Sequence, residues 1–267
     1  MGVQRRQWAD LPDKVRAAVV EHTGPVTKVK AARGGLNSGI AATVHSLDGA
    51  VFVKGLPLGH PQAWTQDREA AIAPHLAEAA PRLLWQIRVG GWNLLGWEHV
   101  EGRHADYTPG SPDLPAVADA LALLGKAACP GDVPVKTVER WRDYVDAPSD
   151  LDRLDGDALL HTDPNSSNVL VGDGGRTLLV DWAWPTRAAA WVDAACWVVW
   201  LITADHTPAE AEQHAATVPA WQQGDDDALA VFARVQSRLW AGIAEADPNP
   251  WTVGVAQAAA RWKEHRT

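Results

Sequence analysis

The sequence predicts an α+β protein made of two dissimilar parts. Short β-branched runs separated by turn residues dominate the N-terminal part of the 267-residue chain, whereas apolar residues at helical spacing dominate the rest. A stretch rich in chain breakers, residues 101–115, separates the two patterns. We therefore expect residues 1–97 to form one lobe, residues 98–102 a connector and residues 103–267 a helical second lobe.

The first lobe should be a small antiparallel sheet interrupted by one helix. A first helix is predicted over residues 11–22, and the intervening one over residues 61–73, with Pro61 in its first turn. The Asp-Gly pair at 48–49 lies between two apolar runs, which predicts a hairpin. The predicted strands are the runs VTKVKAA (26–32), GIAATVHSL (39–47) and AVFVKGL (50–56), with two more in 81–100 around Gly90–Gly91.

The second lobe should be mainly helical. Helices are predicted over 116–128 and over most segments after residue 187, with two short strands flanking the turn at 172–176. The longest apolar segment, residues 188–204, contains Asp193 and is marginal in length for a bilayer span. A buried core helix is the favoured interpretation, with a membrane span as the alternative.

Composition and charge limit the classes of partner. The net charge of −9 argues against nucleic acid as the main partner. Residues 1–97 carry 11 Lys/Arg against 7 Asp/Glu, and residues 98–267 carry 13 against 26. This asymmetry predicts an anion on the first part and a cation on the second, unless it reflects only an acidic, solvated surface.

Cysteine usage and the N-terminus indicate the compartment. Cys129 and Cys196 lie far apart and have no partner at metal-ligand spacing, which is typical of a reduced cytosolic protein. The first residues lack the apolar stretch of a signal peptide. We expect a cytoplasmic protein that acts without a membrane, as a monomer or homodimer.

Two features of the first lobe suit phosphate binding. The Gly-rich turn GGLNSG (34–39), with Gly35 and the small Ser38, lets backbone N–H groups approach a polyphosphate, although many such turns are only hairpins. Lys54 lies in a predicted strand, and Glu69 in the following helix is the candidate carboxylate that holds it. The alternatives are a Lys on an exposed face, a solvated Glu69, or Glu78 as the partner.

The run HTDPNSSNVLV (161–171) suits phosphoryl transfer. Four residues separate Asp163 from Asn168, the interval of a kinase catalytic loop, in which the Asp takes the proton of the substrate hydroxyl and the Asn binds Mg²⁺. Asp181 ends the next apolar run, where a second oxygen ligand is needed. The simpler alternative is a polar loop that precedes a strand.

These segments resemble the aminoglycoside phosphotransferase family. LLHTDPNSSNVLV followed by TLLVDWAW is similar to its catalytic and metal-binding segments, and the connector GWEHVEG (96–102) and the segment WVDAACWVV (191–199) match in order. The resemblance implies a bilobal protein-kinase-like fold. Its N-lobe would be a small antiparallel β-sheet with one helix, and its larger C-lobe would be mainly helical.

The resemblance also implies residue roles. Asp163 would be the catalytic base or orienting carboxylate, and Asn168 and Asp181 would hold Mg²⁺. Lys54 would contact the α- and β-phosphates of ATP or GTP, with Glu69 fixing its position. The backbone groups that bond the adenine edge would be those of Glu98 and Val100.

Four further positions bear on the catalytic loop. His161 is interpreted as packing beneath the loop, with a proton carrier as the alternative. Asp193 is interpreted as tying the loop backbone from a buried helix, with a third metal ligand as the alternative. Thr162 stands where the family usually has Gly, and Pro164 where Leu is common. Both are compatible with a rigid loop.

The predicted function is transfer of the γ-phosphate to a hydroxyl of a small molecule. The acidic second part favours a basic antibiotic such as an aminoglycoside, with Glu101, Asp106, Asp157 and the run at 224–228 as candidate contacts. For that run the preferred interpretation is a helix start. The alternatives are a metabolic kinase acting on a sugar, amino alcohol or nucleoside-like acceptor, and a non-catalytic nucleotide-binding module.

Overall fold

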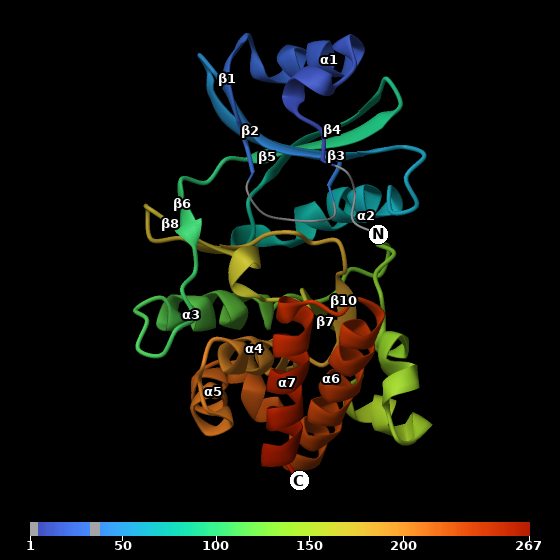
Figure 1. The fold of residues 1–267 in the computed structure, drawn as a ribbon, viewed down its shortest axis with the longest axis vertical. Helices are drawn as coiled ribbons and strands as arrows, with labels where there is room; N and C mark the ends of the chain where they lie inside the picture. Colours follow the sequence, from blue (N-terminus) through green and yellow to red (C-terminus); the bar gives the residue numbers. More distant parts are fainter. Residues whose placement is uncertain (1–4, 33–37) are drawn as a thin grey trace. The chain divides into compact units, whose positions relative to one another are not determined.

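The chain divides into two compact units, Met1–Glu101 (unit 1) and Gly102–Thr267 (unit 2). The structure, a computed structural model, describes residues 5–32 and 38–267. Unit 1 contains a five-stranded antiparallel sheet, and unit 2 is mainly helical with two small sheets (Figure 1). The α+β class predicted from the sequence is therefore confirmed.

The sheet of unit 1 has the strand order β1-β2-β3-β5-β4. The predicted hairpin forms at residues 46–49, and the β4–β5 hairpin turns through Gly90 and Gly91, whose positive φ values of 55° and 81° suit glycine. The bounds are η1 (Trp8–Asp10), α1 (Asp13–Thr23), β1 (Val26–Ala31), β2 (Ile40–Ser46), β3 (Gly49–Pro57), α2 (Trp64–Ile72), η2 (Ala73–His75), η3 (Ala77–Ala79), β4 (Leu83–Val89) and β5 (Trp92–Glu98).

The intervening helix α2 starts later than the sequence predicted. It begins at Trp64, because the residues before it form successive turns in which His60 N–H donates to the Pro57 carbonyl and Ala63 N–H to the His60 carbonyl. Pro61 therefore lies in a turn outside the helix.

The two helices of unit 1 cover opposite faces of the sheet. Val53 packs in a core cluster with Val15 and Val19 of α1, whereas the next residue, Lys54, contacts Glu69 of α2. Successive side chains of a strand point to opposite faces, so β3 is covered on both sides. This placement encloses the second half of β3, where Val53, Lys54 and Leu56 are all buried.

Unit 2 contains two small sheets made of short strands. β6, β8 and β9 form one antiparallel sheet, and β7 and β10 form another. The bounds are β6 (Gly102–His104), α3 (Leu114–Leu124), η4 (Val138–Tyr144), η5 (Pro148–Arg153), β7 (Ala158–Leu160), η6 (Ser166–Asn168), β8 (Val169–Gly172), β9 (Thr177–Leu179), β10 (Thr186–Ala188), α4 (Val192–Thr203), α5 (Pro208–Ala215), η7 (Pro219–Gln223), α6 (Asp226–Ala246) and α7 (Pro250–His265).

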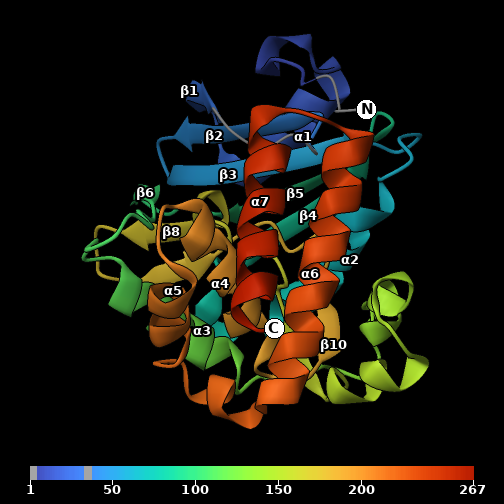
Figure 2. The same ribbon diagram turned by 60° about the horizontal axis from the view of Figure 1, so that its bottom comes forward.

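The helices of unit 2 pack around α4. Every residue of α4 from Val192 to Ile202 is buried, and α4 packs against α5 and α7, while α6 runs along α7 (Figure 2). The apolar segment at 188–204 is thus a core helix, as predicted. Across residues 5–32 and 38–267, none of the helices has the length and apolar character needed to span a bilayer.

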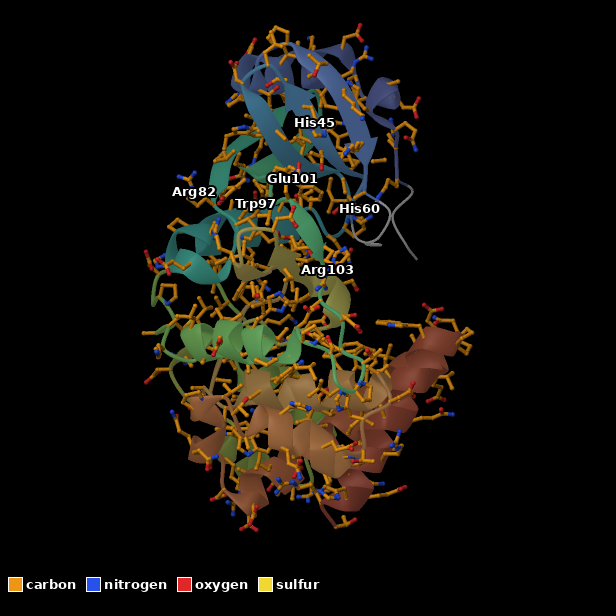
Figure 3. All side chains as sticks on the ribbon, turned by 90° about the vertical axis from the view of Figure 1, so that its left-hand side faces the viewer. His45, His60, Arg82, Trp97, Glu101 and Arg103 are labelled. Atoms are coloured by element: carbon orange, nitrogen blue, oxygen red, sulfur yellow. The ribbon has the colours of Figure 1, made fainter. Side chains whose placement is uncertain are left out.

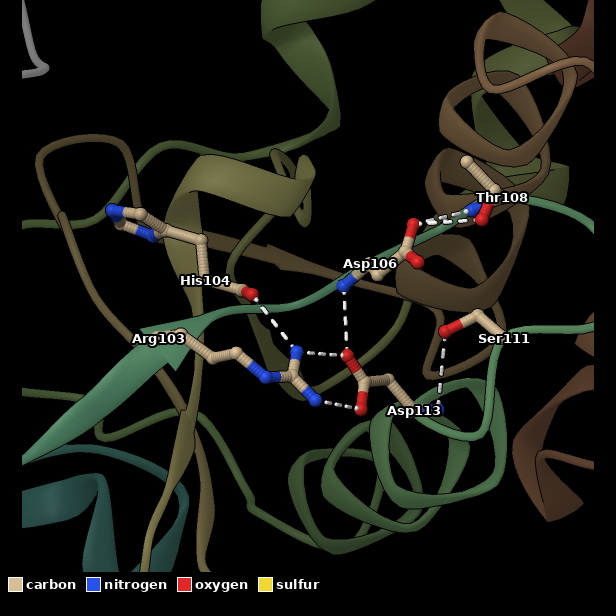
Figure 4. A network of polar contacts seen from close by, with 6 residues as sticks. All are labelled: Arg103, His104, Asp106, Thr108, Ser111 and Asp113. Carbon is tan, nitrogen blue, oxygen red and sulfur yellow. Dashed lines mark hydrogen bonds and ion pairs between the residues drawn. The ribbon is translucent and has the colours of Figure 1, made fainter.

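A polar network fastens the start of unit 2 to α3 (Figure 4). The Arg103 guanidinium donates to both carboxylate oxygens of Asp113, over 2.5 and 2.7 Å, and the Asp106 N–H donates to the same carboxylate over 2.8 Å. Paired donors in this geometry favour the ionised carboxylate, so they hold the pKa of Asp113 below its usual range. The segment that follows β6 is therefore fixed to the first turn of α3.

Candidate active site

The ion pair predicted in unit 1 forms. Lys54 Nζ lies 2.7 Å from Glu69 Oε2, and both side chains are buried. The pair depends on the enclosed position of β3, since α2 places Glu69 over the strand. A buried amine beside a carboxylate is kept charged and oriented, which suits a lysine that contacts phosphates.

The other predicted nucleotide contacts of unit 1 stay predictions. Gly35 lies outside the residues that the structure describes, and Ser38 is half-buried just before β2. Glu98 ends β5, and its backbone N–H donates to the Arg82 carbonyl over 2.8 Å. Figure 3 labels Arg82 and Trp97, whose side chains lie in this part of unit 1. The N–H of Glu98 is thus used within the sheet, which leaves the adenine prediction to its carbonyl and to Val100.

The loop that the sequence predicts to be catalytic runs from β7 to β8 in unit 2. The carbonyl of its last helical residue, Asn168, accepts a hydrogen bond from the Val180 N–H over 2.8 Å, and β8 pairs with β9 from Val169↔Leu179 onward. Asp181 follows directly after this contact. The pairing of β8 with β9 therefore brings Asn168 and Asp181 together, although β8 and β9 are joined by a turn that carries none of the candidate residues.

Two amides hold the carboxylate of Asp163. Asn165 Nδ2 donates to Oδ1 over 3.0 Å, and Asn168 Nδ2 donates to Oδ2 over 3.1 Å and to the Asp163 carbonyl over 3.0 Å. Asn165 also accepts from the backbone N–H of Ser167 over 2.9 Å. The amide of Asn165 therefore caps the short helix that follows and also orients the Asp163 carboxylate.

The pKa of Asp163 is raised to about 6. Burial is the largest cause, since it disfavours the charged form, and the nearby Asp181 carboxylate acts in the same direction. The hydrogen bonds from Asn165 and Asn168 and the charge of Arg140 oppose the shift. At neutral pH the carboxylate is ionised and accepts a proton more readily than an ordinary Asp.

The oxygen donors of Asn168 and Asp181 fit Mg²⁺. Because the Nδ2 group of Asn168 faces Asp163, its Oδ1 is the atom turned away from that carboxylate. Mg²⁺ in phosphotransferases is held by one or two protein oxygens together with phosphates and water. Asp181 has φ of +68°, in the left-handed region that Asp tolerates better than most residues.

His161 and Asp193 hold the loop through hydrogen bonds to backbone groups. Asp193 is buried in α4, and its Oδ2 and Oδ1 accept from the backbone N–H groups of His161 and Thr162 over 2.8 and 2.7 Å. His161 Nδ1 accepts from the Asp163 N–H over 3.2 Å, so Nε2 carries the proton that it shares with the Val180 carbonyl over 2.9 Å. Asp193 thus ties the loop backbone, as the sequence interpretation proposed, and His161, interpreted only as packing beneath the loop, also joins two backbone segments.

Thr162 occupies the strained position where the family resemblance expects Gly. Its φ is +66°, which costs a β-branched residue about 1–2 kcal/mol. Its hydroxyl lies 2.7 Å from Arg140 Nη1, and its N–H is bonded to Asp193. The loop therefore keeps the backbone conformation of a glycine while carrying a side chain.

Arg140 and Tyr107 contact the loop and escaped the sequence analysis. Arg140, in η4, donates to Thr162, and the buried Tyr107 hydroxyl donates to the Pro164 carbonyl over 2.9 Å. Neither residue belongs to a motif. Their separations of 22 and 57 residues from their partners leave no local signal by which sequence reasoning finds them.

Several acidic residues considered for the acceptor have structural partners. Asp106 Oδ1 accepts from the N–H and hydroxyl of Thr108, and Glu101 lies 3.1 Å from His99 Nε2. Asp225 is the N-cap of α6 and accepts from the Ala228 N–H over 2.7 Å. The run at 224–228 is therefore a helix start, as preferred from the sequence.

Comparison with known proteins gives structural neighbours alone. No protein-family model matches the sequence, and no curated protein matches it. Choline kinase LicA from Streptococcus pneumoniae has 13% identity over 94% of this chain and 98% of its own, with a TM-score of 0.65. An aminoglycoside phosphotransferase from Alicyclobacillus acidocaldarius has 15% identity over 98% and 94%, with a TM-score of 0.63.

A spectinomycin phosphotransferase, solved with ADP and spectinomycin, has 13% identity over 94% of this chain and 93% of its own, with a TM-score of 0.58. The chain has the protein-kinase-like fold of these phosphotransferases. At such identities the likeness concerns the fold. It agrees with the fold that the motifs in residues 159–171 and 177–184 implied.

The structure adds local contacts to the candidate residues, which the sequence had identified only by their order along the chain. The Lys54–Glu69 pair, the amide-held Asp163, and the contact between Asn168 and Val180 are each formed in their own unit. Their roles toward nucleotide, metal and acceptor are proposals.

Proposed function

We propose that this protein is an ATP-dependent phosphotransferase that moves the γ-phosphate to a hydroxyl of a small molecule. The observation that carries the proposal is the Asp163 carboxylate, which is fixed by Asn165 and Asn168 and lies close enough to Asp181 for their charges to interact. The two amides fix the orientation of this carboxylate, and the nearby Asp181 charge contributes to its raised pKa. A proton acceptor in phosphoryl transfer needs this restraint.

The reaction assigns one role to each group. The Asp163 carboxylate accepts the proton of the acceptor hydroxyl, whose oxygen forms a bond to the γ-phosphorus as the bond to the β–γ bridging oxygen breaks and ADP leaves. Lys54 contacts the α- and β-phosphates, held by Glu69, and the carbonyl of Glu98 and the N–H of Val100 bond the adenine edge. Asn168 and Asp181 would hold Mg²⁺, which would neutralise charge on the phosphates.

The proposed acceptor is a basic antibiotic such as an aminoglycoside. Residues 98–267 carry 26 acidic against 13 basic side chains, a balance that attracts polycations. One structural neighbour was solved with spectinomycin, and another is named an aminoglycoside phosphotransferase. The fold similarity to a choline kinase favours a second candidate, a metabolic kinase of an amino alcohol or similar acceptor.

The decisive experiment is a phosphate-transfer screen. Purified protein is incubated with Mg²⁺ and ATP, or GTP, and a panel of aminoglycosides, spectinomycin, macrolides, choline, sugars and nucleosides, and products are read by mass spectrometry for an added phosphate. We expect transfer to a cationic acceptor, lost in Asp163→Ala and retained in Asp173→Ala, which changes an exposed turn residue. Equal turnover in Asp163→Ala and wild type would overturn the catalytic assignment.

A further inference from the structure

Arg140 joins the catalytic loop to the segment that follows Asp181. Its Nη1 donates to Thr162 Oγ1 over 2.7 Å and to Thr186 Oγ1 over 2.6 Å, with a longer contact of 3.4 Å to the Trp184 carbonyl. Thr162 precedes the proposed base directly, and Trp184 lies three residues after Asp181. One guanidinium therefore contacts both segments that carry the proposed chemistry.

The position of Arg140 is itself fixed. Lys136 N–H donates to the Pro185 carbonyl over 2.9 Å, and Arg187 N–H donates to the Lys136 carbonyl over 2.8 Å, so the chain just before η4 pairs with the chain at β10. The Arg140 guanidinium also lies 5.5 Å from the ring of the buried Trp141. Thr186, its second hydroxyl partner, is fully buried.

These contacts restrain Thr162 in a backbone conformation that its side chain disfavours. A β-branched residue at φ +66° favours return to an extended backbone, which would move the neighbouring Asp163. The N–H bond to Asp193 restrains the backbone of Thr162, and the Arg140 bond restrains its side chain. A glycine at this position would need no side-chain restraint, since it reaches positive φ without strain.

We propose that Arg140 is a positioning residue for phosphoryl transfer, which acts by holding Thr162 in the left-handed conformation that aims Asp163. The proposal rests on the proposed function, and it makes the Arg140–Thr162 pair a substitute for the glycine that the family resemblance expects. Arg140 touches no reacting atom in this assignment. Its positioning effect passes through Thr162, while its charge also lowers the pKa of Asp163 directly.

The test compares variants in an assay that needs no identified acceptor, the slow formation of ADP from Mg²⁺–ATP with water. Arg140→Met keeps the length of the side chain and removes its donors. We expect kcat to fall about 10- to 100-fold, as for a small misplacement of a catalytic group, while KM for ATP stays within about twofold. Arg142→Met, in the same 3-10 helix but exposed and paired with Glu139, should match wild type.

The Thr162→Gly background decides whether the effect passes through that residue. In Thr162→Gly protein, introducing Arg140→Met should lower kcat by no more than about threefold, because glycine needs no restraint. Thr162→Val removes the hydroxyl and keeps the branch, so its kcat should resemble that of Arg140→Met. The kcat of the double variant Arg140→Met/Thr162→Val should be no lower than that of either single variant. An equal loss on introducing Arg140→Met into wild-type protein and into the Thr162→Gly variant would overturn the proposal.

A second measurement separates failure of this proposal from failure of the proposed function. Amide hydrogen exchange at His161 and Thr162 reports the loop without any turnover, because both N–H groups are bonded to Asp193. Arg140→Met should accelerate their exchange and Arg142→Met should not. If wild type transfers phosphate to neither water nor any acceptor, the proposed function fails. Unchanged exchange in Arg140→Met would overturn the positioning role, whatever the turnover of the wild type.

Discussion

The carboxylate of Asp193 lies 2.7 Å from the backbone nitrogen of Thr162, although 31 residues separate them along the chain. The other oxygen of the same carboxylate accepts from the N–H of His161 over 2.8 Å. One buried side chain of α4 thus satisfies two consecutive amides of the catalytic loop. Burial is the main cause that raises the pKa of Asp193, to about 6, and these two hydrogen bonds oppose it.

This contact predicts a loss of both stability and turnover in Asp193→Ala. Removing the carboxylate leaves two N–H groups of a buried loop without their acceptor, at a cost of about 1–3 kcal/mol for each. We expect a fall in the thermal midpoint and a kcat reduced more than KM for ATP. Asp173→Ala, which changes an exposed residue, serves as the control in calorimetry and kinetics. If Asp193→Ala has the same thermal midpoint as Asp173→Ala, the prediction is contradicted.

Substitution of Lys54 should separate stability from nucleotide binding. Lys54→Met removes the cation that faces the buried Glu69 carboxylate, and loss of one partner of a buried pair costs about 3–5 kcal/mol. The double variant Lys54→Met/Glu69→Leu should regain much of that stability but none of the affinity for ATP. Thermal unfolding and ATP titration of both proteins test this.

Lys30→Met is the matched control for Lys54, because Lys30 lies exposed on β1. It should leave both stability and ATP binding as in wild type. Full ATP affinity in the Lys54→Met protein would contradict the phosphate assignment. Full stability of that variant would contradict the energetic role of the buried pair.

The raised pKa of Asp163 predicts a stability that depends on pH. A folded-state pKa of about 6, above the ordinary value near 3.8, means that the folded protein binds a proton which the unfolded chain releases between these values. The contribution of Asp163 to stability therefore falls as pH rises from about 4 to about 6. Above that range the buried charge destabilises the native state.

Asp163→Asn removes this charge with little change of shape. In metal-free protein we expect its thermal midpoint to exceed that of wild type at about pH 8, and the difference to shrink toward about pH 4.5, where wild-type Asp163 is protonated. Phosphoryl transfer should be lost at both pH values. A midpoint difference that does not change with pH would show that Asp163 has an ordinary pKa.

The sequence by itself determined the elements and the identity of most candidate residues. The alternation in β3 and the helical spacing around Glu69 located both members of the ion pair, and the interval from Asp163 to Asn168 located the loop. These signals are local, because strand and helix periods are written in neighbouring residues. The strands β6, β7 and β10 escaped detection, since three residues are too few to show a period and no turn motif marks these strands as the turn at 172–176 marks the equally short β9.

Only the tertiary structure decided which contacts hold the loop in place. Arg140 and Tyr107 reach it across 22 and 57 residues, and the bonds of Asp193, whose supporting role the family resemblance had implied, cross 31. The left-handed conformation of Thr162 likewise follows from its partners, because its own side chain disfavours that backbone. Long-range packing sets such contacts, and a residue's type carries no record of its distant neighbours.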